Sequence, residues 1–370
     1  MEFSCTKKDF ANSLQIISRA VSSKQQMPIL SGIYLKADNN TLELQATDYE
    51  IGLIAKIHAE IESPGQIVLS GRYLQEVVRK LPGETVTFSF HREENIANIK
   101  SNQSKFTLLC MNPSEFPTIP FLEGDINFTI KNNILQNLIK KTVFACGTDE
   151  SRPIFTGCYM EVNDITVTMA ATNMHRLAIK TETFNEPLGN IKIIIPAKTL
   201  NELLHIMTSE IPVDVHVSCS HNKISFAFDN IYMTSRLIEG SFPNYQNVIP
   251  KESSTKVKIN TSEFSSAVDR VSLISRSNEY NIIRLSFSNG QVHISSNSPE
   301  IGNAEEIVSA SVEGPDVNIA FNAKYITDAL KNIDAEECSF SLQQSLNPLT
   351  IREKGDDTFL YVATPVRTNH

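Results

Sequence analysis

In six segments of the chain, apolar residues recur at the spacing i, i+3, i+4, i+7, which places them on one face of an α-helix. Three of these segments follow a run of β-branched residues: IVLSGRYLQEVVRKL from Ile67, IIIPAKTLNELLHIM from Ile193 and IAFNAKYITDALKNI from Ile319. The other three are DFANSLQIISRAV from Asp9, NNILQNLIKKTVFA from Asn132 and SEFSSAVDRVSLI from Ser262. The pattern predicts six amphipathic helices, with Ser70 and Asn322 as N-caps and Pro196 in a first helical turn.

These segments repeat along the chain. The three strand-then-helix segments start 126 residues apart. MPILSGIYLKAD from Met27 is similar to RPIFTGCYMEVND from Arg152, and ATDYEIGL from Ala46 is similar to ATNMHRLAI from Ala171. Alternating runs between the helices, such as VDVHVSCSHNKISFAFDN, predict antiparallel hairpins. We therefore expect an α+β fold of three tandem domains over residues 1–124, 125–252 and 253–370, each with two helices packed on an antiparallel sheet.

Basic residues are concentrated in the predicted helices, although the formal net charge of the 370 residues is -9. The helical segments carry fifteen Lys and Arg against six Asp and Glu, and Arg72, Lys198 and Lys324 stand at the same position of the three repeats. If the helices share one face, that face attracts a polyanion such as nucleic acid through its phosphates, without reading base sequence. Exposed helices are often rich in Lys and Arg, so an ordinary solvated surface is the alternative.

Other features of the composition argue against several classes of protein. The apolar runs are shorter than a membrane span and the N-terminus lacks the order of a signal peptide, so we expect a cytoplasmic protein. The 6 cysteines and 8 histidines are dispersed, which indicates buried free thiols and no metal site. No motif supplies His175 with a nucleophile and an orienting carboxylate. A hydrolase or nuclease that uses His175 is therefore the weaker hypothesis, and a repeated interaction module without DNA function is a third.

The chain also resembles a known family over essentially its whole length. The segments MPILSGIYL, ATNMHRLAI, SFPNYQNVIP, FNAKYITDAL and YVATPVR occur in the order typical of the bacterial DNA polymerase III β subunit, the sliding clamp. The resemblance implies a head-to-tail homodimer, closed into a ring of six domains whose helices line a hole for double-stranded DNA. It implies a non-catalytic processivity factor, without cofactors, that tethers the replicative polymerase, the clamp loader and repair proteins through short linear peptides.

The resemblance assigns residues to three sites. The dimer contact is expected between Phe106 and Leu108 of the first domain and Leu273 and Ile274 of the third. The DNA-facing residues implied by the family are Lys24 and Arg152, and the charge pattern adds Arg72, Arg79, Lys198 and Lys324. Partner peptides are expected in an apolar pocket between the second and third domains, lined by Phe155, Thr172, His175, Arg176, Leu177, Pro243, Val248, Asn322, Tyr325, Leu346, Val362, Pro365, Val366 and Arg367.

The sequence departs from the family at three positions of this pocket. Met174, Asn247 and Thr364 stand where glycine, arginine and methionine are usual. The first change alters the backbone approach, the second removes a charge and the third makes one wall smaller and more polar. We therefore expect the pocket to bind a peptide from a distant species more weakly than that species' own clamp does. Residues 368–370 extend slightly beyond the usual end of the family.

Overall fold

The computed structural model describes residues 1–22, 27–276 and 281–367. By its internal contacts the chain divides into two compact units, residues 1–133 with 202–237 and residues 134–201 with 238–370. The unit boundaries cut through the second predicted repeat, because its strands contribute to the sheets of both units. The repeat boundaries after residues 124 and 252 therefore stay predictions.

The described part of the chain contains six α-helices, and each overlaps a segment whose apolar spacing predicts a helix. They are α1 (Lys7–Ile17), α2 (Gly71–Lys80), α3 (Asn132–Lys140), α4 (Ala197–Ile206), α5 (Thr261–Ser275) and α6 (Ala323–Leu330). The side chain of Asn322 caps α6 by accepting a hydrogen bond from the Lys324 amide. Ser70 holds the N-cap position of α2 without a side-chain cap bond, and Pro196 ends the strand before α4 instead of entering the helix.

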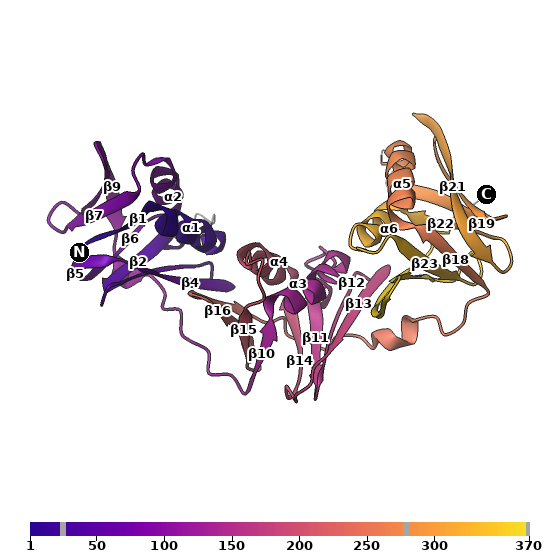
Figure 1. The fold of residues 1–370 in the computed structure, drawn as a ribbon, viewed down its shortest axis with the longest axis horizontal. Helices are drawn as coiled ribbons and strands as arrows, with labels where there is room; N and C mark the ends of the chain where they lie inside the picture. Colours follow the sequence, from indigo (N-terminus) through magenta and orange to yellow (C-terminus); the bar gives the residue numbers. More distant parts are fainter. Residues whose placement is uncertain (23–26, 277–280, 368–370) are drawn as a thin grey trace. The chain divides into compact units, whose positions relative to one another are not determined.

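In the first unit, the described strands form one antiparallel sheet of 13 strands. In spatial order they are β10 (Ile126–Lys131), β15 (Asp214–Cys219), β16 (Lys223–Phe228), β17 (Ile231–Arg236), β4 (Ile51–His58), β3 (Thr41–Thr47), β2 (Gly32–Asp38), β6 (Gly65–Ser70), β9 (Ser104–Met111), β8 (Ile96–Ser101), β7 (Thr85–His91), β1 (Glu2–Thr6) and β5 (Glu60–Ser63). Helices α1 and α2 pack against each other, and α1 covers β3 and β4 (Figure 1).

In the second unit, the described strands form an antiparallel sheet of 12 strands. The order is β14 (Asn190–Pro196), β11 (Gly157–Asn163), β12 (Thr166–Thr172), β13 (Arg176–Thr183), β25 (Asp356–Ala363), β24 (Leu349–Glu353), β23 (Glu337–Leu342), β18 (Thr255–Asn260), β21 (Gly302–Glu313), β20 (Gln291–Ser298), β19 (Ile282–Ser288) and β22 (Val317–Asn322). Helix α5 packs on α6 and on β19, β20 and β21. Both units thus bury the apolar faces of helices against antiparallel sheet.

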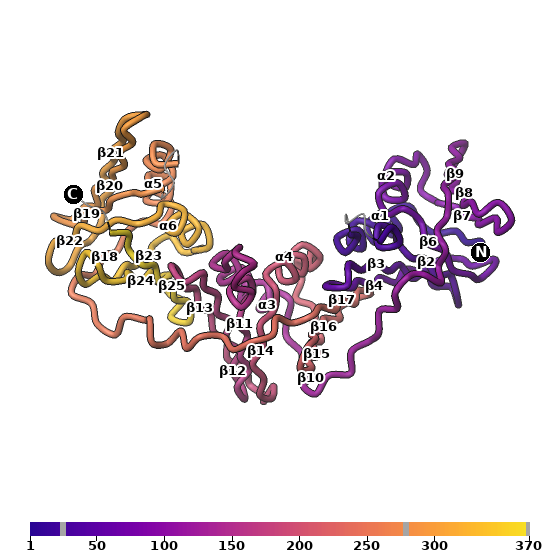
Figure 2. Tube along the Cα trace, turned by 180° about the vertical axis from the view of Figure 1, so that it is seen from behind, coloured from indigo at the N-terminus to yellow at the C-terminus, as the bar shows by residue number. Residues whose placement is uncertain are grey.

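Two long connections carry equivalent aromatic contacts. Residues 112–125 follow β9 and residues 238–254 precede β18, and both run largely outside the sheets (Figure 2). Phe116 stacks on Tyr34 with ring centroids 5.3 Å apart, and Phe242 stacks on Tyr159 at 5.1 Å. Because these residues also match in the sequence repeat, the aromatic contact is part of the repeated structure.

Candidate partner-binding site

The turn between β12 and β13 is held by its own side chains. Thr172 Oγ1 accepts from the Met174 amide at 3.0 Å and donates to the Arg176 carbonyl at 2.6 Å. Asn173 Oδ1 accepts from the amides of His175 and Arg176, both at 3.1 Å. Met174 itself adopts φ 76°, in the left-handed region that glycine occupies most easily. Met174 therefore places a side chain at a backbone position that glycine occupies most easily.

The first repeat contains the same turn. Thr47 Oγ1 accepts from the Tyr49 amide at 3.1 Å and donates to the Ile51 carbonyl at 2.8 Å, while Asp48 Oδ1 accepts from the Ile51 amide at 2.8 Å. Tyr49 has φ 71°, as Met174 has 76°. The similarity of ATDYEI and ATNMHR thus reflects one hydrogen-bonded turn, which positions the side chains that follow it.

A cavity of about 250 Å³ opens beside this turn in the second unit. Leu177 on β13 and Val362 on β25 are direct cross-strand partners at its wall. Both belong to a buried apolar cluster against which Phe242 and Tyr245 pack. The complete lining is Phe155, Thr172, Met174, Arg176, Leu177, Pro243, Asn244, Tyr245, Val248, Pro348, Val362 and Thr364. Such a mostly apolar, preformed cavity suits an aliphatic or aromatic anchor of a ligand.

The cavity brings together half of the pocket residues expected from the sequence. Phe155, Thr172, Arg176, Leu177, Pro243, Val248 and Val362 line it, whereas His175, Asn322, Tyr325, Leu346, Pro365, Val366 and Arg367 lie outside its lining. Met174 and Thr364, expected as altered positions of the pocket, also line it, and Asn244, Tyr245 and Pro348 are additional lining residues. Asn244 and Tyr245 directly follow the repeated Phe-Pro pair, so the sequence repeat could have pointed to them as lining residues. Asn247 is exposed on the adjacent 3₁₀ helix η6 (Tyr245–Val248) and does not line the cavity.

His175 and Arg176 have different surroundings. The exposed ring of His175 lies nearly parallel to the ring of Tyr325, with centroids 6.4 Å apart, and its carbonyl accepts from the Thr364 amide at 2.9 Å. Arg176 is only 7% exposed, and its guanidinium pairs with Asp328 at 2.6 Å and donates to the Phe144 carbonyl at 2.5 Å. The charge of Arg176 is therefore largely engaged within the protein, so this residue supports the wall of the cavity more than it offers a free cation.

The exposed basic residues are spread over several elements. Arg72, Arg79, Arg152, Lys198 and Lys324 are all exposed, and Lys24 lies outside the described residues. Arg72 and Lys324 approach Glu76 and Asp328, one helical turn further along, at 3.5 and 3.2 Å. The Arg72 pair is exposed on both sides and therefore weak, and the charge of Asp328 is shared with Arg176, so both cations still attract phosphate.

The position of Lys141 shows that one basic residue of the predicted helix surface is buried. It was counted with the basic helix surface, but α3 ends at Lys140 and Lys141 is only 3% exposed. Its ammonium group binds Glu353 and Asp334. Lys131 also pairs with Asp214, at 2.7 Å. The basic helix surface is consequently smaller than the sequence count indicates.

Two strand edges expose apolar residues. Residues 104–109 of β9 pair with β8 on one side, and residues 302–309 of β21 pair with β20 on one side. No described strand pairs with the other side of either segment. On and beside these edges, Phe106 is 40%, Leu109 79%, Ile307 61% and Leu273 55% exposed; Leu108 and Ile274 are partly buried. Leu109 and Ile307 were not expected from the sequence.

All six cysteines are free and buried, as expected from their dispersed spacing. Burial raises the pKa of Cys5, Cys110 and Cys219 to about 12 and that of Cys338 to about 11. Within the described residues, no group of three or more His, Cys, Asp or Glu side chains could hold a metal ion. No helix among them has the length and apolar character needed to cross a membrane.

We expect these thiols to be unreactive in the folded protein. Because the thiolate is the reactive form and burial disfavours it, a thiol reagent such as DTNB at mildly alkaline pH should label native protein very slowly. All 6 thiols should react at once in concentrated guanidinium chloride. Rapid labelling of one thiol in native protein would show that its site opens more readily than its burial indicates.

Comparison with known proteins gives one consistent result. Residues 1–120, 129–244 and 246–367 match the N-terminal, central and C-terminal domains of the family described as DNA polymerase III beta subunit. The beta sliding clamp of Bacillus subtilis is 35% identical over 379 residues, covering 100% of both chains. Its crystal structure superposes with a TM-score of 0.94 at 34% identity over 100% of both chains. A Pseudomonas aeruginosa sliding clamp, described as bound to griselimycin, has a TM-score of 0.94 at 30% identity, again covering 100% of both chains.

Proposed function

Since the chain belongs to the family of DNA polymerase III beta subunits, the sliding clamps, we propose that two copies of it close head to tail into a ring around duplex DNA. Membership of the family makes it a processivity factor of DNA polymerase III and confirms the α+β clamp fold expected from the sequence. In our proposal the protein is cytoplasmic, catalyses no reaction itself, needs no cofactor and uses the cavity of the second unit to hold partner proteins.

The observation that carries this proposal is the pair of half-paired strand edges. Within the chain, β4 pairs with β17, and β13 pairs with β25. By repeat position, β21 corresponds to β4 and β13, and β9 corresponds to β17 and β25. A third junction of the same kind therefore requires β21 of one copy beside β9 of another. Such a head-to-tail contact forms a ring when its rotation closes.

The side chains at these edges fit that junction. Phe106 and Leu108 lie on the face of β9 whose cross-strand neighbours, Ile99 and Ala97, are buried. We expect them to meet Leu273 and Ile274 on α5, and we expect Leu109 and Ile307 to meet on the opposite face. Burial of these apolar residues and pairing of both strand edges would stabilise the dimer.

The DNA-facing surface in this proposal is formed by Arg72, Arg79, Arg152, Lys198 and Lys324, all exposed, and by Lys24, which lies outside the described residues. Contacts of this kind recognise phosphate and not base sequence. A ring needs few of them, because topology and not affinity keeps it on DNA.

The cavity beside β13 and β25 is the proposed docking site for short linear peptides of the replicative polymerase, the clamp loader and repair proteins. Its apolar lining would take an anchor side chain. Thr172 and Asn173 are already engaged in the turn, so they fix the shape of the wall. Specificity would then come from the shape of the cavity and from the exposed polar groups around it.

Retention on circular DNA tests the ring. The protein is loaded onto nicked circular DNA with a matching clamp loader and ATP, and its retention in high salt is measured before and after the circle is linearised. We expect retention on the circle and loss on linear DNA, because salt screens phosphate contacts equally in both cases. Equal loss from circle and linear DNA, with a loader proven active, would rule out the ring.

Charge reversal tests the DNA-facing surface. Replacing Arg72, Lys198 and Lys324 together with glutamate should lower loading onto DNA by about tenfold at moderate salt, because the phosphates then face three acidic groups. The three positions are exposed, so the fold should persist in circular dichroism. A matched reversal of Lys36, Lys192 and Lys256, which are exposed on strands, controls for net charge. Equal loading by the two variants would contradict the assignment.

A further inference from the structure

Three cations of the second unit, all from residues 134–201, bind carboxylates that all come from residues 323–363. Lys141 binds Glu353, Arg176 binds Asp328 and Lys180 binds Asp356, at 2.5, 2.6 and 2.8 Å. The three cations are at most 7% exposed. These contacts surround the pairing of β13 with β25. The three cations lie on the β13 side of this junction, and the carboxylate closest to each lies on the β25 side.

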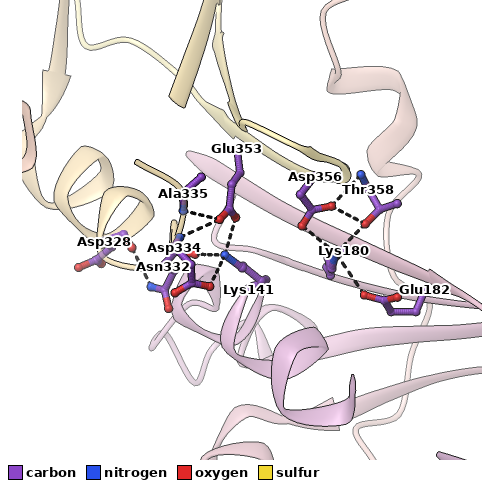
Figure 3. A network of polar contacts seen from close by, with 10 residues as sticks. All are labelled: Lys141, Lys180, Glu182, Asp328, Asn332, Asp334, Ala335, Glu353, Asp356 and Thr358. Atoms are coloured by element: carbon purple, nitrogen blue, oxygen red, sulfur yellow. Dashed lines mark hydrogen bonds and ion pairs between the residues drawn. The ribbon is translucent and has the colours of Figure 1, made fainter. Parts of the chain in front are cut away.

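The Lys141 cluster is fully satisfied (Figure 3). The ammonium group donates to the Asn332 carbonyl at 2.6 Å and to Asp334 at 3.0 Å, besides Glu353. The second oxygen of Glu353 accepts from the amides of Asp334 and Ala335 at 2.8 and 2.7 Å. A buried pair with all its hydrogen bonds made resists separation, because either partner left alone would be an uncompensated buried charge.

The Lys180 cluster has the same design (Figure 3). Lys180 is 4% exposed and donates to Asp356 and to Thr358 Oγ1 at 2.8 and 2.6 Å, with Glu182 on its own strand at 3.2 Å. Burial raises the pKa of Asp356, but the hydrogen bonds from Lys180 and Thr358 lower it by more. The pKa of Asp356 therefore lies below its usual value. The Asp356 carboxylate is therefore ionised at neutral pH.

The junction of β4 with β17 and the two free strand edges differ from this arrangement of charges. The junction of β4 with β17 contains an apolar cluster of Ile54, Ile119 and Tyr232, and Lys56 on β4 is exposed. The free edge of β9 has exposed Lys105, opposite Lys100 on β8, whereas the free edge of β21 has Glu305 and Glu306. The proposed contact of β9 with β21 thus has the reverse polarity of the contact between β13 and β25.

We propose that the buried cations at β13 are specificity determinants, which select β25 as the neighbour of β13 and exclude β9 of another copy. Placing β9 beside β13 would bring Lys105 close to Lys180, which would lose Asp356 and keep Glu182 on its own strand. Placing β21 beside β25 would bring Glu305 to Asp356. Like charges in these wrong pairings suppress them, which restricts assembly to the intended ring. This inference rests on the proposed ring only for the identity of the excluded partner.

A charge-free variant of the full chain tests the inference. Lys141→Met, Lys180→Met, Glu353→Gln and Asp356→Asn together remove both pairs, while Gln and Asn keep acceptors for the Asp334, Ala335 and Thr358 amides. The control is Lys131→Met with Asp214→Asn, an exposed pair whose side chains are 48% and 52% exposed. Native mass spectrometry measures assembly, and hydrogen exchange measures the amides of residues 359–363.

We expect the charge-free variant to form assemblies of three or more chains and to exchange these amides at least about tenfold faster, while the control behaves like wild type. Wild-type assembly and exchange in a folded charge-free variant would overturn the inference. If that variant does not fold, Lys100→Glu with Lys105→Glu gives a second test. Both lysines are exposed, and carboxylates there should permit pairing with β13 and so produce larger assemblies; their absence would equally overturn it. A wild-type protein that stays a single chain would refute the proposed ring, whereas the exchange measurement would still test the role of the cations.

Discussion

Replacing Leu273 with aspartate should convert the two-copy assembly into single chains. Leu273 is 55% exposed on α5, so the carboxylate is solvated in the free chain. In the dimer the carboxylate would be buried against Phe106 and Leu108 without a partner, at a cost of roughly 3 kcal/mol. That cost corresponds to about 100-fold weaker association at one junction, and a closed pair contains the junction twice. Mass photometry over a dilution series measures the change.

Ile211→Asp is the matched control for this substitution. Ile211 is 72% exposed in the connection between α4 and β15 and belongs to neither free strand edge. It should leave the assembly unchanged, and both variants should keep the wild-type circular dichroism spectrum at room temperature. Unchanged association of the Leu273 variant would mean that α5 is not part of the dimer contact.

The second large effect is expected in the cavity of the second unit. Val248 is 56% exposed and lines the cavity, so Val248→Asp places a carboxylate where an apolar anchor would bind without disturbing the core. The affinity for a fluorescent peptide from the organism's own replicative polymerase should fall at least about tenfold, because the bound carboxylate loses water without gaining a partner. Fluorescence anisotropy at constant salt measures the dissociation constant.

Leu346→Asp distinguishes the cavity seen in the structure from the pocket expected from the sequence. Leu346 is 61% exposed and apolar like Val248, but it lies outside the cavity lining. We expect its replacement to change the affinity much less. Equal loss from both variants would show that the peptide reaches beyond the cavity, and unchanged affinity in both would place the peptide elsewhere.

The helices and the repeat could be predicted from the sequence because both depend on local spacing. The buried faces of α2 and α6, with Leu74 and Val78 or Ile326 and Leu330, follow directly from the i, i+4 pattern. The shared turn at Thr47 and Thr172 was likewise visible as repeated letters. Cap chemistry was less certain, since Ser70 occupies the right position and yet forms no side-chain bond.

The limits of sequence reasoning lie in contacts between distant segments. The cavity depends on the pairing of Leu177 with Val362, which only the sheet order reveals. The burial of Lys141 follows from Glu353, more than 200 residues away, so a count of helix charges could not detect it. The exposure of Leu109 and Ile307 likewise depends on which strands remain at an edge.

The two half-paired strand edges also make a lone chain vulnerable. Unpaired backbone groups beside exposed Leu109 and Ile307 are a template for uncontrolled β-sheet growth, the first step of amyloid-like aggregation. Lys105 and Glu305 oppose such growth between identical edges, because each repels its own kind. A newly made chain is therefore safest once it meets a second copy, and the cellular concentration of the protein becomes part of its protection against misassembly.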